Sequence, residues 1–506
     1  MKSLVDLCVD NVVAHVDALW AKDFLANYHG QAHWLFTLGP FDTLPASLAH
    51  KIWLNLKNRK LLRKHHVYLL LHPGLRELDA SREQVDLGLA LHLASVRCPG
   101  LRRLDLSWAP KFPKATFVQL YPSFPGLTTL DLSGIKVVDD EVASLLGVYG
   151  GSLRSLDLSS TGVSGRGLRT LALKEDLKGK PDPRYGQCVG LRFLGLQVTH
   201  VSPEEVASIL GSLKDLVDLS YEESLESVSY YLRENRDVKR LRLKFLSSKS
   251  PSLPKEDLSL VLSKCNDLVK LHLSCFEELD WSCFLPLAEK AEIDLRELQV
   301  SNEFGVADAS MVNTLTPLLL GHGKSLVNLA FSEVADVNVE VILNCCPNLV
   351  SLSLQFNEAY SRNDQNHQED EGFGEKGLER LKFLKVLCRE TSGDVLTSNS
   401  PSRGEILRLL SSPKLESVEI SHCERLDDET FGQAFIQHDF AQLEHLSLIA
   451  CNNIRFSDLS EFLSQSRKLK HVQFRMCQDI YLSDIQKYKA DLARRRLVKK
   501  IQVDWT

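Results

Sequence analysis

A leucine motif that recurs along most of the chain is the feature that most restricts how this sequence can fold. The motif has the form Leu-x-x-Leu-x-Leu, and clear copies begin at Leu101, Leu127 and Leu153, each 26 residues after the one before. Copies in which another apolar residue replaces a leucine, or in which the motif is shortened, bring the series to about fifteen units. They begin at Leu75, Leu191, Leu216, Val238, Leu268, Leu295, Leu326, Leu349, Leu378, Leu415, Leu443 and Leu469.

The spacing inside one unit predicts a short strand followed by a helix. The Leu-x-Leu part alternates with period two, which points its leucines to one face of a strand. Residues 139–146 show the helical return, because Val142, Leu145 and Leu146 recur at helical spacing. One unit cannot bury its apolar face alone, whereas stacked units cover one another. We therefore expect an α/β solenoid that resembles the curved, ribonuclease-inhibitor-like leucine-rich-repeat horseshoe, with parallel strands inside and helices outside.

The repeat pattern also predicts the domain organisation. Residues 1–66 lie before it and are predicted to be helical, residues 67–480 form the solenoid, and residues 481–506 form a C-terminal cap. Two stretches break the period, the acidic segment 359–376 and the segment 389–404, which is rich in serine, threonine and glycine. Such compositions are typical of exposed loops.

Composition limits the function classes. The formal net charge is −6, so the chain has no basic excess that would favour nucleic acid. We interpret one short basic cluster, Arg494 to Lys500, as a solvated helix face. No stretch approaches the roughly 18 apolar residues that cross a bilayer. Asp6 and Asp10 interrupt the apolar core that a secretory signal requires. We expect no membrane or nucleic-acid partner, and a location in the cytoplasm, the nucleus or both.

The sequence offers no pattern for catalysis, a cofactor or a metal. It contains no glycine-rich phosphate loop, no His-Glu-x-x-His and no Gly-x-Ser-x-Gly. The twelve cysteines include no pair with zinc-binding spacing, so we expect small buried side chains rather than ligands. Four of them, Cys275, Cys423, Cys451 and Cys477, follow predicted strands, where a thiol would turn into the core and donate weakly to backbone carbonyls. The chain is thus predicted not to be an enzyme.

The N-terminal segment is predicted to begin with a helix that runs to about Trp20. Ser3 followed by Asp6 suits the start of this helix, because both side chains can meet the unpaired N–H groups of its first turn. Two apolar stripes are expected on it, and Asp6, Asp10 and Asp17 mark the polar side. The stripes are Leu4, Cys8 and Val12, and Val5, Val9, Val12 and Val16. Such a helix must dock on something.

Residues 3–12 resemble the elongin BC-box, which has the pattern small-Leu-x-x-x-Cys-x-x-x-aliphatic, at Leu4, Cys8 and Val12. Residues 44–52 resemble the cullin-2 box, which has the pattern aliphatic-Pro-x-x-aliphatic-x-x-x-aliphatic. The matching positions are Leu44, Pro45, Leu48 and Ile52. Both motifs, followed by leucine-rich repeats, are similar to the von Hippel-Lindau-box receptors, particularly the zyg-eleven and zer families.

This resemblance implies a non-catalytic substrate receptor of a cullin-RING ubiquitin ligase. Elongin C, together with elongin B, would take Leu4, Cys8 and Val12, and cullin-2 with its RING protein would take the second motif. Such a receptor needs only to hold a protein substrate close to the charged ubiquitin carrier. The chain departs from the two families because it lacks their C-terminal armadillo-like repeats, so substrate choice would come from the repeat surface.

Three other interpretations remain open for the same residues. The N-terminal helices can be a cap that covers the open end of the solenoid, which any repeat protein needs. The segment from Leu44 to Leu56 also fits the start of an F-box, which would bring a Skp-type adaptor instead. The chain can also be a scaffold or inhibitor that binds a partner without a ligase.

Outward-facing strand positions are the expected contact surface for a protein substrate. Early units place Asp105, Asp131 and Asp157 in register, although they belong to a common Leu-Asp-Leu-Ser consensus that structure alone can explain. The final units offer Glu419, His445, His471 and Arg475. The middle units are expected to form a basic ladder of Arg240, Arg242, Lys244, Lys270 and His272. We hypothesise that this ladder pairs with acidic or phosphorylated side chains of the substrate.

Overall fold

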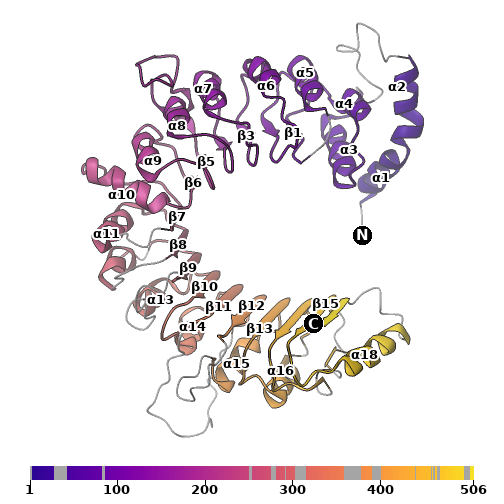
Figure 1. The fold of residues 1–506 in the computed structure, drawn as a ribbon, viewed down its shortest axis with the longest axis vertical. Helices are drawn as coiled ribbons and strands as arrows, with labels where there is room; N and C mark the ends of the chain where they lie inside the picture. The colour runs from indigo at the N-terminus through magenta and orange to yellow at the C-terminus, as the bar shows by residue number, and fades with distance from the viewer. Residues whose placement is uncertain are drawn as a thin grey trace. The chain divides into compact units, whose positions relative to one another are not determined.

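The chain divides into two compact units, Met1–Arg236 and Asp237–Thr506, and each is described by itself (Figure 1). The computed structural model describes residues 3–27, 41, 43–82, 86–249, 254–274, 281–290, 292–302, 315–357, 378–389, 400–438, 440–456, 459, 462–463, 468–494 and 502–505. The predicted loop 359–376, most of the loop 389–404, Cys275 and the basic residues after Arg494 lie outside these ranges.

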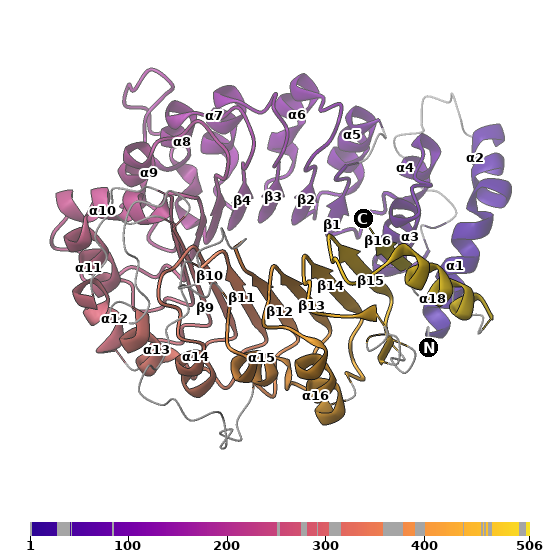
Figure 2. The same cartoon turned by 60° about the horizontal axis from the view of Figure 1, so that its bottom comes forward.

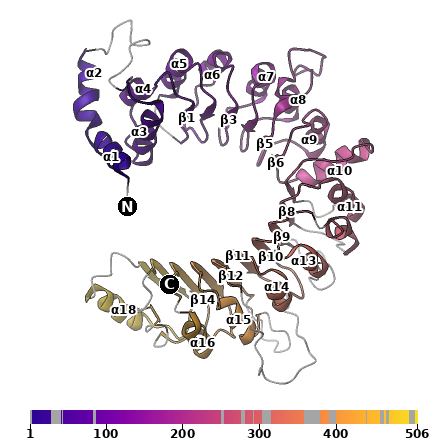
Figure 3. The ribbon, with the colours of Figure 1, turned by 180° about the vertical axis from the view of Figure 1, so that it is seen from behind.

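The N-terminal unit begins with helices, as predicted (Figure 3). They are α1 (Leu4–Val16), the π-helical turn η1 (Asp17–Ala21), α2 (Lys22–Asn27), α3 (Ala46–Asn58) and α4 (Lys64–Leu70). The predicted cap at Ser3 is confirmed, because the Asp6 N–H donates to Ser3 Oγ at 3.2 Å and the Ser3 N–H donates to Asp6 Oδ2 at 3.2 Å. The helical run continues past Trp20 to Asn27, and the boundary predicted at residue 66 falls inside α4.

The predicted repeats follow and form a parallel sheet in the order β1-β2-β3-β4-β5-β6. The strands are β1 (Glu77–Asp79), β2 (Arg103–Asp105), β3 (Thr129–Asp131), β4 (Ser155–Asp157), β5 (Phe193–Gly195) and β6 (Asp218–Ser220). The central leucine of each motif pairs with the next, so Leu104 lies opposite Leu130 and Leu130 opposite Leu156. All three are at most 1% exposed, which confirms that stacked units bury one another.

Helices return along one side of these strands, as Figures 1 and 3 show. They are α5 (Leu87–Arg97), α6 (Lys114–Leu120), α7 (Asp140–Tyr149), α8 (Gly165–Ala172), α9 (Pro203–Leu210) and α10 (Ser224–Glu234), with the 3-10 turns η2 (Tyr121–Ser123) and η3 (Gln187–Gly190). Neighbouring helices approach closely. A Cβ on Gly147 would lie 2.2 Å from the Thr170 carbonyl oxygen, so only glycine fits between α7 and α8 there.

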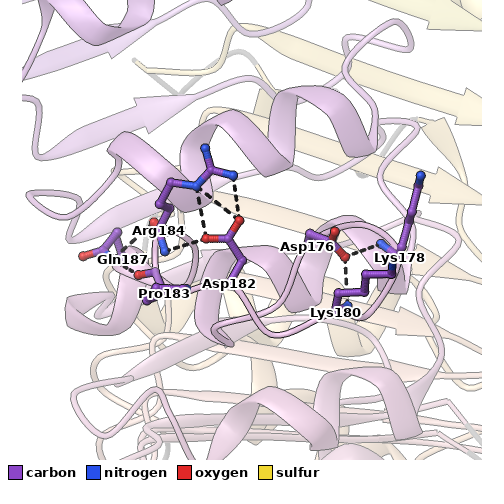
Figure 4. Close-up of polar contacts among 7 residues, drawn as sticks. All are labelled: Asp176, Lys178, Lys180, Asp182, Pro183, Arg184 and Gln187. Atoms are coloured by element: carbon purple, nitrogen blue, oxygen red, sulfur yellow. Dashed lines mark hydrogen bonds and ion pairs between the residues drawn. The ribbon is translucent and has the colours of Figure 1, made fainter.

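An insertion lengthens the connection between β4 and β5, which the sequence pattern did not single out (Figure 4). Its two turns are held by carboxylates. Asp176 Oδ1 accepts the N–H groups of Lys178 and Lys180, each at 2.8 Å. Asp182 takes the Arg184 guanidinium in two parallel bonds of 3.1 and 2.7 Å. These bonds lower the pKa of Asp182 and keep the inserted turn ordered at the surface.

The C-terminal unit is a second array of the same kind, with a ten-stranded parallel sheet (Figure 2). Its strands are β7 (Phe245–Ser248), β8 (Lys270–Ser274), β9 (Glu297–Ser301), β10 (Asn328–Ser332), β11 (Ser351–Gln355), β12 (Phe383–Leu387), β13 (Ser417–Ser421), β14 (His445–Ile449), β15 (His471–Arg475) and β16 (Gln502–Trp505). Its helices are η4 (Trp281–Phe284), α11 (Lys255–Lys264), α12 (Leu285–Ala288), α13 (Thr316–His322), α14 (Val339–Cys345), α15 (Arg403–Leu410), α16 (Asp428–His438) and α18 (Leu482–Arg494). The predicted α/β repeat architecture is confirmed in both units.

Two repeats were predicted in the wrong frame. At the first, β7 begins at Phe245, and Leu246, not Leu241, pairs with Leu271 of the next strand. The third motif position is Ser248, which is 0% exposed. Because this position holds a serine in place of a leucine, the leucine pattern did not predict the correct frame. At the second, Leu384 pairs with its neighbours in place of Leu381.

Cysteines follow several strands of the C-terminal unit, as expected, and point into its core. Cys423, Cys451 and Cys477 are all at most 6% exposed. The Cys451 thiol donates to the Ile420 carbonyl at 3.6 Å, and the Cys477 thiol lies 3.5 Å from the Leu448 carbonyl. These contacts confirm the predicted role of a thiol at this position.

The predicted C-terminal cap adds one more repeat. Helix α18 returns to β16, which pairs in parallel with β15, so Val503 lies opposite Val472. The sequence search missed this strand because its pattern, Gln-Val-Asp-Trp, contains no leucine. Among the described residues no helix has both the length and the apolar character needed to cross a membrane.

The stacking of the motif leucines predicts the effect of shortening one of them. Leu156 is 0% exposed and lies between two neighbouring strands, so Leu156→Ala should lower the free energy of unfolding by about 2–5 kcal/mol. Ser155→Ala, at the adjacent outward-facing position, should change it by less than about 0.5 kcal/mol. Urea denaturation of both variants measures the difference, and equal stabilities would refute this description of the core.

Candidate functional site

Helix α1 has one face buried in the protein and one face exposed. Val9, Val13 and Val16 are 8%, 3% and 1% exposed, and α1 packs on α3. On the other face Leu4 is 77% exposed, and Cys8 is exposed as well. Val12 lies half-buried between the two faces. The two residues at the start of the predicted elongin motif are therefore reachable from solvent.

The predicted second stripe of α1 needs a correction. Val5 was expected to lie with Val9 and Val16, but it is 44% exposed, and Val13 takes the buried position instead. Leu7, which no motif position specifies, is 53% exposed beside Leu4. Leu4, Val5, Leu7 and Cys8 thus form an exposed apolar patch, which we call the α1 patch. A helical-wheel comparison of i, i+3 and i+4 positions would have found Leu7.

Polar contacts hold the buried face of α1 in place. Asn55 of α3 donates from Nδ2 to Asp10 Oδ1 at 2.9 Å, and Arg59 forms an ion pair with the same carboxylate. Asp10 was expected on the solvated side, yet its side chain is 23% exposed and bonds across to α3. The α1 patch is consequently presented by a helix that is fixed to the rest of the unit on its other side.

Asp17, at the end of α1, meets two histidines at the start of α4. Asp17 Oδ1 lies 2.6 Å from His65 Nε2 and 2.9 Å from His66 Nε2. The three side chains are close enough for a shared cation, and within the described residues they form the one such group. His66 Nδ1, however, accepts the Arg63 N–H at 3.0 Å, so Nε2 must carry the ring proton and donate it to Asp17. That proton occupies the position a metal would need, and we interpret the group as a hydrogen-bonded cluster that joins α1 to α4.

Asp17 and His66 both have shifted pKa values. Burial of the imidazole, followed by the nearby charge of His65, lowers the pKa of His66 to about 4, against the opposing effect of Asp17. Burial would raise the pKa of Asp17, but the hydrogen bonds from His65 and His66 hold it below its usual value. His66 is therefore neutral at physiological pH.

The predicted cullin motif lies at the start of α3. Pro45 is exposed, and Leu44 and Leu48 are half-buried. Ile52 is 2% exposed, so its side chain can only support the surface from beneath. Trp53, also buried, donates from Nε1 to the Asp79 carbonyl oxygen at 2.6 Å and ties α3 to the first repeat.

The predicted basic ladder is not a ladder. Arg240, Arg242 and Lys244 precede β7 instead of lying on a strand, because the repeat frame begins later than expected. Arg240 forms an ion pair with Asp267 at 2.7 Å. Lys270 and His272 do lie on β8, but both contact Glu297 of β9, at 2.9 and 2.7 Å. Both side chains are therefore paired with the neighbouring strand.

The strand face of the last repeats is paired in the same way. Lys385 of β12 lies 3.3 Å from Glu419 of β13, and His471 of β15 lies 2.9 Å from Asp504 of β16. His445 and His471 are register neighbours, as predicted from their spacing. Several charged side chains of this face are thus paired with a side chain of the neighbouring strand.

The early aspartates stand in register, with Asp105 opposite Asp131 and Asp131 opposite Asp157. Each accepts the N–H of the serine two residues later, for example Ser133 to Asp131 Oδ1 at 2.9 Å. Burial and the two flanking carboxylates raise the pKa of Asp131, although the Ser133 bonds oppose the shift. These aspartates stabilise the turn after each strand, which supports the structural explanation of the consensus.

Comparisons with known proteins agree with the repeat architecture. A family model described as "Leucine Rich repeat" matches residues 152–172, which contain β4 and all of α8. The chain is 24% identical over 237 residues to the DNA repair protein rhp7 of Schizosaccharomyces pombe, and the alignment covers 44% of this chain and 39% of that protein. The chain thus matches less than half the length of this curated relative.

The chain is also similar to a solved structure titled "Crystal structure of Rad7 and Elc1 complex in yeast". The sequence identity is 12%, the TM-score is 0.47, and the match covers 96% of each chain.

The Asp17 cluster predicts a pH dependence of the helices that carry the α1 patch. Since the folded pKa of His66, about 4, lies below the unfolded value of 6.5, the unfolded segment takes up the proton first as the pH falls. The stability contributed by neutral His66 is full above pH 6.5 and is lost towards pH 4, by up to about 3 kcal/mol. Hydrogen exchange of α1 and α4 amides should show this loss, and His66→Gln should flatten it. An unchanged pH profile in the variant would contradict the assignment.

Proposed function

We propose that this chain is the substrate-recognition subunit of a cullin-RING ubiquitin ligase. The observation that carries the proposal is the α1 patch, in which Leu4 and Cys8 are exposed on a helix whose other face is fixed to α3. A contiguous exposed apolar group on an otherwise polar surface marks an interaction site. The motif resemblance names its partner as elongin C, bound together with elongin B.

Burial of Leu4 would supply much of the elongin contact. Moving one fully exposed leucine into a pocket is worth roughly 1.5–3 kcal/mol. Leu4 is 77% exposed and projects from the first turn of α1, so it can enter a pocket without any rearrangement of the helix. Cys8, one turn later, would pack beside it, and Val12 would border the contact.

The cullin contact is proposed at the start of α3. Pro45 with the half-buried Leu44 and Leu48 offers the surface, and Ile52 holds the helix in place from the core. The α1 and α3 helices pack directly on each other, so the proposed adaptor and cullin surfaces belong to one helical layer of the N-terminal unit. A substrate would then bind to the repeats.

The burial pattern of α3 favours elongin over the F-box alternative. Ile52, Trp53 and Leu56 are all at most 3% exposed and belong to the core of the unit. They leave α3 with little apolar surface for a Skp-type adaptor, whereas the α1 patch is outside any F-box pattern. A scaffold without a ligase remains the second candidate.

No chemistry of its own is proposed for the chain, and no cofactor or metal. The ligase rate would come from holding the substrate near the ubiquitin carrier that the RING protein brings. The relative named as a DNA repair protein favours the nucleus among the two expected compartments. We therefore propose a nuclear substrate.

Co-purification tests the proposal directly. Leu4→Ser and Cys8→Arg should remove elongin B, elongin C and cullin-2 from the purified complex, because each puts a polar group into an apolar pocket. Leu19→Ser is the matched control, since Leu19 is 58% exposed on the same helical run but outside the motif. Mass spectrometry of the three preparations reports adaptors and substrates together.

Two outcomes would contradict the proposal. If the wild-type chain brings down partners but no elongin, the scaffold function is correct. If a Skp-type adaptor is recovered and Leu4→Ser retains it, the chain is an F-box receptor. Loss of elongin from Leu19→Ser as well as Leu4→Ser would show a general defect of the helix instead of a specific contact.

A further inference from the structure

A basic pocket lies in the N-terminal unit, whereas the residues of the predicted substrate ladder belong to the C-terminal unit. It measures about 1020 Å³. Its walls come from the end of α3, the connection to α4, the turns after β1 and β2, and the start of α5. The lining residues are Lys57, Asn58, Lys60, Leu62, Arg63, Lys64, Ser81, Arg82, Asp86 and Ser107. Five of these side chains are cationic and one is acidic.

One of the five cations is committed to the fold. Lys57 is 12% exposed, forms an ion pair with Asp79 and donates to Ser81 Oγ at 2.6 Å. Burial would raise the pKa of Asp79, but the hydrogen bonds from Lys57 and Ser81 lower it, so this pair is a fixed part of the wall. The serine hydroxyls are also in use, since Ser107 Oγ donates to Asp105 at 2.7 Å.

The other four cations, Lys60, Arg63, Lys64 and Arg82, form what we call the basic rim. Arg63 lies 3.8 Å from Asp17, and Lys64 lies 3.5 Å from Asp86, with side chains 64% and 58% exposed. Exposed pairs at such distances contribute little. Lys60 and Arg82 are exposed and form no ion pair with any residue of the described ranges. Among the described residues, two of the rim cations therefore have no ion pair, and the other two have only exposed ones.

Two rim residues occupy backbone positions that favour glycine. Lys60 has a φ of 57° and ends α3 in a Schellman motif, in which Leu61 N–H donates to Leu56 O and Lys60 N–H donates to Lys57 O. Arg82 has a φ of 58°. A side chain in this left-handed region costs about 1–2 kcal/mol relative to glycine. Among the described residues, twelve that are not glycine occupy this region, and two of them place a cation on this pocket.

The Arg82 position recurs in later units without a charge. The left-handed residue after the strand is Trp108, Gly134, Ser160 and Val198 in the four units that follow. Among these five units, a cation occupies this position in the unit beside the pocket. The left-handed turn therefore recurs from unit to unit, whereas the cation at this position occurs in the unit that lines the pocket.

We propose that the basic rim binds a phosphorylated segment of a protein substrate. A phosphoryl group on serine or threonine carries nearly two negative charges and three acceptor oxygens, which suits a rim whose four cations are either unpaired among the described residues or held only in exposed ion pairs. The pocket is much larger than one phosphate and can take neighbouring residues. A nucleic acid fits less well, because it needs a stripe of cations, whereas the basic rim surrounds a single pocket that Asp86 also lines. This inference rests on the proposed function only in calling the peptide a substrate.

Glycine substitution separates binding from folding. In the full chain, Lys60→Gly with Arg82→Gly removes two charges and relieves both left-handed positions, so the melting temperature should stay equal or rise. Binding of a fluorescein-labelled Gly-Ser peptide with two phosphoserines should weaken at least about tenfold, as expected for two lost charge-assisted contacts. The control Lys111→Gln with Arg166→Gln removes two exposed cations elsewhere in the unit and should bind like wild type.

Further arms identify the source of the anion. The unphosphorylated peptide should not bind, its glutamate version should bind more weakly, and inorganic phosphate should compete. Equal binding by the glycine variant would overturn the proposal. So would single-stranded DNA that binds at the rim without a preference for the phosphopeptide, or a glycine variant that retains elongin but loses cullin-2, because the rim would then serve the ligase.

The same preparations keep the two proposals distinguishable. Leu4→Ser should lose elongin C and still bind the phosphopeptide, and the glycine variant should do the reverse. If wild type binds the phosphopeptide but no elongin, the ligase assignment fails while the rim site stands.

Discussion

Each repeat of this protein can bury its leucines only against the next repeat, and that dependence shapes everything else. The central leucines form one row through the sheet of each unit, and the first row must be closed by something other than a repeat. Helices α3 and α4 do this at the N-terminal end, where Trp53 donates to the backbone of β1. Once α3 is committed to this closure, it provides the surface on which Val9, Val13 and Val16 of α1 pack. The opposite side of α1 is left to the solvent, and the proposed adaptor contact is a consequence of how the solenoid is capped.

In this arrangement the helical segment can cap the array and still offer the proposed adaptor site, so the two interpretations of the sequence are compatible. The buried face of the helical segment caps the array, and the exposed face of the same segment is available to a partner. The Asp17 cluster and the Asp10 contacts to Asn55 and Arg59 hold α1 with one face buried and the other exposed. A partner that binds the α1 patch therefore meets a preformed surface, and little conformational entropy is lost on binding.

Much of the fold was predictable because the leucine motif is unambiguous where it is clean. The units at Leu101, Leu127 and Leu153 have no competing frame, and the strands lie where the pattern placed them. The repeat predicted at Val238 was in the wrong frame because the buried serine at position 248 replaces a motif leucine. The same error placed the first three residues of the basic ladder on a strand. The pairing of Lys270 and His272 with Glu297 was not predicted either, because it depends on which side chains of two neighbouring strands lie close together. Most positions of α1 are apolar, so only the location of α3 decides that Val13 is buried and Val5 is not.

Recognition by exposed side chains on a fixed helix is the central claim, and hydrogen exchange measured with purified elongin B and C tests it most directly. On addition of the elongin pair to the full chain, the account predicts slower amide exchange across residues 4–12 and little change across the strands of either unit. Unchanged exchange in α1 at saturating elongin, or protection confined to the repeats, would contradict it.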